Sequence, residues 1–75
     1  SRPLLDVNVL QPLSVRELTI LRMVGEGLTS KEIAESLHSS VRTIENTIAR
    51  ISNKLGIRGR AKLIRIALRY SLPSS

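Results

Sequence analysis

Residues 41–55 carry the side chains in this sequence that are best suited to chemistry on another molecule. Their apolar members recur four, three and four positions apart, at Ile44, Ile48, Ile51 and Leu55. At roughly 100° per residue, this spacing predicts a helix with one narrow apolar face. The opposite face, within roughly 40° of its centre, carries Arg42, Asn46, Ala49 and Asn53, and Arg50 lies a little further round.

Those side-chain types match the chemistry of base edges in the DNA major groove. Arginine forms bidentate hydrogen bonds with guanine, asparagine does so with adenine, and the alanine methyl can contact the thymine methyl. Only the N-terminal half of such a helix usually reaches the bases. We therefore predict base contacts from Arg42, Glu45, Asn46, Ala49 and Arg50, with Glu45 on the flank as an acceptor for cytosine. The alternative is an ordinary solvated helix face.

The distribution of charge favours the first interpretation. The net charge of +6 and the isoelectric point near 11.2 indicate a polyanionic partner. All six acidic residues lie at or before Glu45, whereas seven cations and no acid follow from Asn46 onward. A charge run is usually a solvated face, but so one-sided a split in a short chain favours an anion-binding surface. The predicted phosphate contacts are Lys31, Thr43, Lys54, Arg58 and Arg60.

Other classes of function are disfavoured by composition. The chain has no cysteine, which excludes disulfides and thiolate zinc sites and fits a reducing cytoplasm. Its one aromatic residue, Tyr70, leaves no platform on which unpaired bases could stack. His38 stands alone in a predicted turn, without metal partners or a nucleophile. We expect no enzymatic activity, no metal, no cofactor and no membrane-spanning segment.

The elements that position the central helix are marked by capping signals. Ser14 with Glu17, and Thr29 with Glu32, form two capping boxes. Each is flanked by a hydrophobic staple, Leu13 with Leu18 and Leu28 with Ile33. Ser40 can cap the third helix, and the glycines at positions 27 and 56 are expected to end the first and third helices.

The sequence therefore predicts an all-α fold, a compact four-helix bundle with a helix-turn-helix. The helices are expected at about 15–26, 30–37, 41–55 and 60–70, with Leu63, Ile64, Ala67 and Leu68 of the fourth facing inward. We expect residues 1–12 to be a linker, 13–72 the DNA-binding domain and 73–75 a disordered tail. Because there is no initiator methionine, we also expect the chain to be part of a longer protein.

Several motifs resemble the LuxR-type (NarL/FixJ-like) helix-turn-helix domain over residues 13–72. They are Leu13-Ser14-x-Arg16-Glu17, Ile20-Leu21, the run from Gly27 to Ala34, Ser40-x-x-Thr43-Ile44, and Lys54-Leu55-Gly56-Ile57-x-x-Arg60. The resemblance implies a C-terminal effector domain whose third helix enters the major groove and whose fourth helix forms a dimer contact. By position it places base contacts at Glu45, Asn46 and Ala49, and phosphate contacts at Lys31, Thr43 and Lys54, with Arg58 or Arg60 nearby. The predicted dimer residues are Leu63, Ile66, Ala67 and Tyr70.

This sequence departs from the family pattern at a few positions. Ser39 stands where a branched apolar residue is usual, and Thr47 replaces a frequent histidine. Gly59 and Lys62 replace the capping residue and the acidic residue that are usual at the start of the fourth helix. We therefore expect the start of that helix to be less stable by about 0.5 to 1 kcal/mol.

The predicted function is sequence-specific binding of duplex DNA by a cytoplasmic bacterial transcription regulator, of the response-regulator type. The expected partners are duplex DNA and a second copy of the chain, and RNA polymerase is a further candidate partner. A sigma-factor promoter-binding region shares the first three helices, but the fourth helix argues against it. From another class, the basic, amphipathic fourth helix could dock on acidic membranes or on partner proteins.

Overall fold

The computed structural model describes residues 10–69, and these form four helices. They are α1 (Val15–Gly25), α2 (Ser30–Ser36), α3 (Val41–Leu55) and α4 (Arg60–Arg69). The described part contains no strand, so the all-α prediction is confirmed. The first two helices end one residue earlier than predicted, and the predicted end of the fourth, at residue 70, lies outside the described range.

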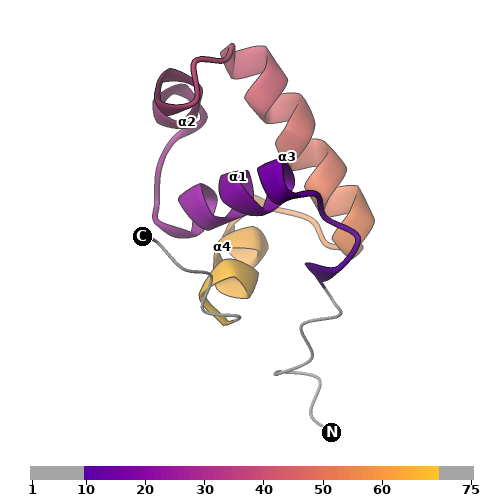
Figure 1. The fold of residues 1–75 in the computed structure, drawn as a ribbon. Helices are drawn as coiled ribbons and strands as arrows, with labels where there is room; N and C mark the ends of the chain where they lie inside the picture. The colour runs from indigo at the N-terminus through magenta and orange to yellow at the C-terminus, as the bar shows by residue number, and fades with distance from the viewer. Residues whose placement is uncertain (1–9, 70–75) are drawn as a thin grey trace, which may run out of the picture.

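Helix α1 is the central element of the fold. In Figure 1 it crosses the middle of the molecule, with α3 running along one side and α4 beneath it. A short turn joins α2 to the start of α3, and α2 packs chiefly on α3. Because α1 packs against both α3 and α4, it fixes the position of the helix-turn-helix relative to the fourth helix.

Both predicted capping boxes are present. The Glu17 backbone amide donates to the Ser14 hydroxyl at 3.1 Å, and the Ser14 amide donates to the Glu17 carboxylate at 2.8 Å. The pair of Thr29 and Glu32 forms the same reciprocal bonds at 3.1 and 2.7 Å. These bonds satisfy amides that the first turn of a helix leaves unpaired, which explains why α1 and α2 begin where they do.

The turn between α2 and α3 is closed by a residue in the left-handed conformation. His38 has a φ of 55°, and the Ser39 amide donates back to the Ala34 carbonyl at 2.8 Å. The third helix then begins at its predicted cap, where the Thr43 amide donates to the Ser40 hydroxyl at 3.0 Å. Gly56 ends α3 with a φ of 67°, a conformation that costs glycine little.

The core is aliphatic and includes one residue from the predicted linker. Leu10 is buried, and its carbonyl accepts a bond from the Leu13 amide at 3.0 Å. The other fully or nearly enclosed side chains come from all four helices, chiefly Ile20, Leu21, Val24, Ile33, Ile44, Ile51 and Leu63. The α3 residues Ile44, Ile48 and Ile51 are buried as predicted, and Leu55 packs at the core's edge.

The prediction for the buried face of α4 is wrong at one position. Leu63 and Ala67 are buried and Ile64 is partly buried, but Leu68 is 65% exposed. The buried face is centred on Leu63 and Ala67, which are four residues apart, and each further residue turns the helix by about 100°. Leu68 therefore points away from α1.

Helices α1 and α4 approach closely at Gly25. A β-carbon placed on Gly25 would lie only 2.5 Å from the β-carbon of Ala67. Real β-carbons essentially never lie so close to another atom, so the crossing requires a residue without a side chain in α1. Two small residues thus set the distance between the two helices.

Candidate nucleic-acid interface

The outward face of α3 carries the residues predicted to contact bases. Arg42, Glu45, Asn46, Ala49 and Arg50 are all exposed, whereas Ile44 and Ile48 on the inner face are buried. A single helix therefore presents guanidinium, carboxylate, carboxamide and methyl groups to solvent while it is held from behind by the core. The structure places these side chains together on one side of the molecule.

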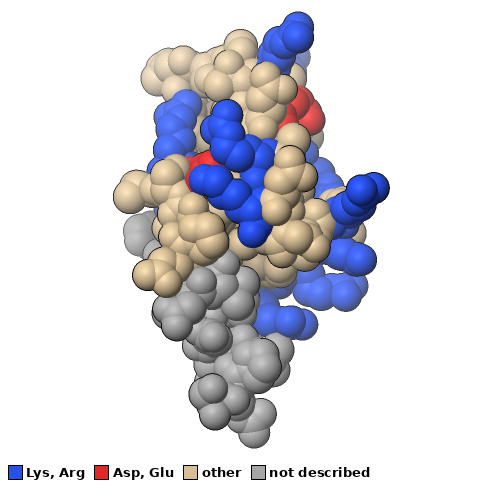
Figure 2. Space-filling model, turned by 90° about the vertical axis from the view of Figure 1, so that its right-hand side faces the viewer, with Lys and Arg blue, Asp and Glu red and all other residues tan. Residues whose placement is uncertain are grey.

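Lysine and arginine side chains gather on that side. Figure 2 looks onto the side of the molecule along which α3 runs in Figure 1, and basic groups occupy its centre and its right-hand edge. Acidic groups show on only a small part of this view. The surface around α3 is thus positively charged, as binding to a polyanion requires.

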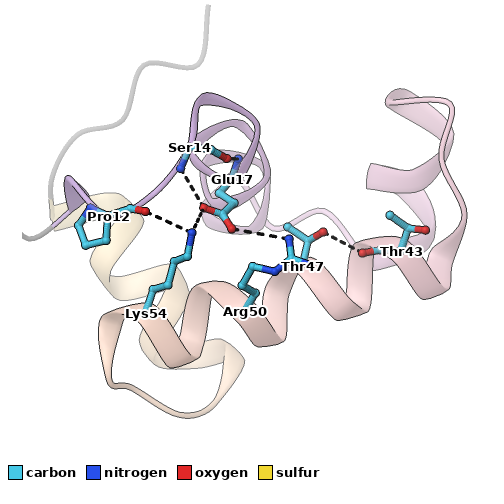
Figure 3. Close-up of polar contacts among 7 residues, drawn as sticks. All are labelled: Pro12, Ser14, Glu17, Thr43, Thr47, Arg50 and Lys54. Carbon is cyan, nitrogen blue, oxygen red and sulfur yellow. Dashed lines mark hydrogen bonds and ion pairs between the residues drawn. The ribbon is translucent and has the colours of Figure 1, made fainter.

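A buried carboxylate joins α1 to α3. Oε1 of Glu17 accepts from the Lys54 ammonium at 2.9 Å as well as from the Ser14 amide, and Oε2 lies 3.8 Å from Arg50 Nη1 (Figure 3). The Glu17 side chain is only 5% exposed. The hydrogen bond from Lys54 and that from the Ser14 amide lower the pKa of Glu17 below its ordinary value, against the opposing effect of desolvation.

These bonds change the interpretation of two predicted DNA contacts. Lys54, predicted to bind phosphate, also donates to the Pro12 carbonyl at 3.2 Å, so its ammonium is used within the protein. Arg50, predicted to contact bases, is 59% exposed and lies on the flank of α3 that faces Glu17. Neither the bond from Lys54 nor the ion pair of Arg50 was predicted, because Glu17 is far from both in the sequence.

Arg60 is likewise engaged inside the protein. Its guanidinium donates to the Leu28 carbonyl at 2.8 Å and to the Ser30 hydroxyl at 3.3 Å. These bonds fasten the first residue of α4 to the turn between α1 and α2 and to the first residue of α2. They anchor a helix that lacks a capping box, since Gly59 has no side chain with which to cap it.

The remaining phosphate candidates lie on the surface. Lys31 is exposed in the first turn of α2, and Arg58 is exposed in the turn before α4. Thr43 is exposed in the first turn of α3, where its hydroxyl accepts from the Ser40 hydroxyl at 2.9 Å. All three are therefore sterically available to a ligand.

The predicted dimer residues differ in how far they are exposed to solvent. Leu63 and Ala67 are 1% and 3% exposed, so they belong to the core of the single chain and are not available to a second copy. Ile66 is partly buried, and Tyr70 lies outside the described residues. The large apolar residue exposed on α4 is Leu68, which was expected to face inward.

One residue beside this interface was missed. A groove between the start of α1 and the flank of α3 that faces α1 is lined by Ser14, Arg16, Glu17, Thr43, Asn46, Thr47 and Arg50. Arg16 is exposed, and within residues 10–69 it forms no hydrogen bond or ion pair. In the sequence, Arg16 lies within the capping box at the start of the first helix. Because it is far from α3 along the chain, the sequence did not predict that the two would line one groove.

Two negative findings hold for the described residues. No group of three or more histidine, cysteine, aspartate or glutamate side chains in that range could hold a metal ion. None of the four helices combines the length and the apolar character that crossing a membrane requires.

Comparisons with known proteins agree with this architecture. The family model described as "Bacterial regulatory proteins, luxR family" matches residues 11–67. The response regulator Rre1 of Synechocystis is 42% identical over 57 residues, which cover 76% of this chain and 25% of that protein. The oxygen regulatory protein NreC of Staphylococcus aureus is 43% identical over 60 residues, covering 80% of this chain and 28% of that protein. The chain thus spans about a quarter of the length of these relatives, and no solved structure matches it.

Proposed function

This chain belongs to the luxR family of bacterial regulatory proteins, and we propose that it binds duplex DNA sequence-specifically as the effector domain of a response regulator. Membership of that family makes it a DNA-binding domain of transcription regulation and not an enzyme. Similarity to a quarter of each relative, one of which is named a response regulator, supports a longer protein in which another domain controls this one. Such a regulator would act in the cytoplasm, where its DNA is.

The observation that carries the proposal is the composition of the outward face of α3. That face is backed by a buried apolar face, so the core holds the helix from behind while its outward residues remain exposed. In this proposal Arg42 contacts guanine, Asn46 contacts adenine, Glu45 accepts from cytosine and Ala49 contacts a thymine methyl. The ion pair with Glu17 draws Arg50 to the flank of α3, so we remove Arg50 from this base-contacting set.

Contacts to the DNA backbone are proposed for exposed groups around α3. Lys31 lies in the first turn of α2, where free amides add to the attraction for a phosphate. Thr43 can donate a hydroxyl, and Arg58 adds a charge beyond the end of α3. Lys54 and Arg60 are used inside the protein, which argues for structural roles instead.

Pairing of two copies is proposed to use α4. A domain of this size should bind DNA weakly alone, and two linked half-sites raise its affinity. Leu68 is 65% exposed and, together with the partly buried Ile64, forms an apolar surface that a second copy could cover. This surface replaces the predicted contact through Leu63 and Ala67.

The proposal is tested by in vitro selection from a random duplex pool, followed by a salt titration of the selected duplex. We expect an enriched repeat with regular half-site spacing. If about five phosphates are neutralised per copy, the logarithm of the binding constant should fall against the logarithm of salt with a slope of roughly −4 to −5. Absence of any enriched sequence together with a slope near zero would contradict the proposal.

A further inference from the structure

We propose that Arg16 of α1 and Arg50 of α3 together bind a backbone phosphate of duplex DNA in the groove between the two helices. This phosphate site deepens the proposed function and rests on it. It adds α1 to an interface otherwise assigned to α2, α3 and the turn before α4. Arg16 belongs to the Leu13-Ser14-x-Arg16-Glu17 motif, but neither the predicted phosphate contacts nor those that the family resemblance implies include it.

The groove lies where a DNA backbone must pass. Asn46 lines the groove and also belongs to the outward, base-contacting face of α3. An α-helix with its side chains is about 10–12 Å wide, and the major groove is about 12 Å wide. A helix in that groove therefore has phosphates along both of its flanks. The flank of α3 that faces α1 carries Thr43, Thr47 and Arg50, all of which line the groove.

The charge of the site suits an anion. Arg16 and Arg50 line the groove, and Glu17 is the one acidic residue among those that line it. The hydrogen bond from Lys54 at 2.9 Å occupies one oxygen of that carboxylate. The ion pair of Arg50 with Glu17 is longer, 3.8 Å, and the Arg50 side chain remains 59% exposed. The guanidinium groups of Arg16 and Arg50 are thus accessible, and guanidinium binds phosphate oxygens in a bidentate way.

Arg16 has no other role that the described residues reveal. It is exposed in the first turn of α1, where a cation opposes the helix dipole, and no hydrogen bond or ion pair with residues 10–69 holds it. Folding alone would favour a neutral or acidic residue there. A phosphate bound in the groove would reverse this preference, because the start of a helix attracts anions.

Glu17 is the positioning residue of this site. Its carboxylate is fixed by Ser14 and Lys54, and it draws Arg50 toward the α1 flank of α3 rather than toward the base edges. Arg50 should therefore contribute affinity without sequence preference. This separates the phosphate site from base recognition by Asn46, although the two are adjacent.

The test compares Arg16→Ala, Arg16→Lys and Arg50→Ala with the wild-type chain of residues 1–75. Binding is measured to the selected duplex and to a duplex of unrelated sequence, each over a range of salt. We expect Arg16→Ala and Arg50→Ala to weaken both complexes by a similar factor, about 3- to 10-fold, and to make each salt slope shallower by about one. Arg16→Lys should keep the wild-type slope, because it keeps the charge.

Arg69→Ala is the matched control. Arg69 is an exposed cation in the last turn of α4, a helix that packs chiefly on α1, so this variant removes one charge elsewhere. It should leave the salt slope unchanged.

Three outcomes would overturn the phosphate site. One is an Arg16→Ala variant that binds like the wild type with the same slope, and another is an equal loss in Arg69→Ala. The third is an Arg50→Ala variant that selects a different DNA sequence, since Arg50 would then contact bases. Failure of the wild-type chain itself to bind duplex DNA would instead refute the proposed function, and the phosphate site with it.

Discussion

The carboxylate of Glu17 in α1 lies 2.9 Å from the ammonium of Lys54 in the last turn of α3. The same carboxylate accepts the Ser14 amide at the start of its own helix. One nearly buried side chain therefore performs two tasks: it completes the cap of α1 and fastens α1 to α3. One of the contacts that hold α3 against α1 is therefore made by a group whose charge can be titrated.

Stability should fall in acid because of Glu17. Its pKa is lowered from 4.5 in the folded chain, so the stabilisation it provides is complete above pH 4.5 and is lost as the pH falls through the lower, folded value. Glu17→Gln should be less stable than the wild type at neutral pH and should show a flatter decline below pH 4.5. Denaturant unfolding over that range measures this. Glu45→Gln is the control, because Glu45 is exposed; an equally flattened profile there would show that Glu17 is not responsible.

Sequence preference should depend on Asn46 more than on Asn53. Both are exposed asparagines near the centre of the outward face of α3, two helical turns apart, so they form a matched pair. We expect Asn46→Ala to lose discrimination at an adenine position by about 1–3 kcal/mol, and Asn53→Ala to keep it, because the N-terminal half of the helix reaches the bases. Selection from a random pool with each variant measures this. Equal effects of the two substitutions would contradict the proposed orientation of α3.

Arg60 should matter for stability and Arg58 for DNA affinity. Arg60→Ala removes bonds to Leu28 and Ser30, so we expect a loss of about 1–3 kcal/mol in the free energy of unfolding. Arg58→Ala should unfold like the wild type but bind DNA with a salt slope shallower by about one. Thermal unfolding and salt titration of both variants test this. The reverse pattern would restore Arg60 as the phosphate contact.

Pairing of two copies should depend on Leu68. Leu68→Ser removes an exposed apolar side chain from α4, so we expect weaker self-association and loss of cooperative binding to a duplex with two half-sites, with little change in thermal stability. Sedimentation and binding curves measure this. Val15→Ser, at an 81% exposed apolar residue of α1, is the control and should leave association unchanged. If both variants paired like the wild type, α4 would not be the dimer surface.

A methyl group at position 25 should separate α1 from α4. Gly25→Ala gains about 1 kcal/mol from helix propensity but places a β-carbon 2.5 Å from that of Ala67, and such overpacking costs about 1–3 kcal/mol. We expect a net loss of stability. Adding Ala67→Gly should recover part of it, because the methyl that clashes is removed. Chemical unfolding of Gly25→Ala, Ala67→Gly and the double variant gives the coupling free energy between the two positions. Strict additivity would refute the close approach.

Local features of the fold were predictable from the sequence. Ser14 with Glu17, and Thr29 with Glu32, are three residues apart and satisfy each other's amides, so they specify helix starts without tertiary information. The apolar spacing of Ile44, Ile48 and Ile51 likewise identified the buried face of α3. Exposure of the candidate base contacts followed from the same periodicity.

Features that depend on distant partners were not predictable. Lys54 is 37 residues from Glu17, and Arg60 is 32 residues from Leu28, so both cations looked like free surface charges. In α4, apolar residues surround too much of the helix for periodicity to select the buried side, and the crossing with α1 at Gly25 decides that Leu68 is exposed. The groove containing Arg16 exists only because α1 lies across α3.

The two ends of α3 serve different purposes. Lys54, near its end, is bonded to Glu17 and Pro12, whereas the exposed residues Arg42, Glu45, Asn46 and Ala49 stand in its first three turns. Those four side chains can therefore be exchanged without disturbing the attachment of the helix. Under the proposed function, the sequence preference of such a domain could therefore change through substitutions at these four positions alone, while the residues that hold α3 in place stay the same.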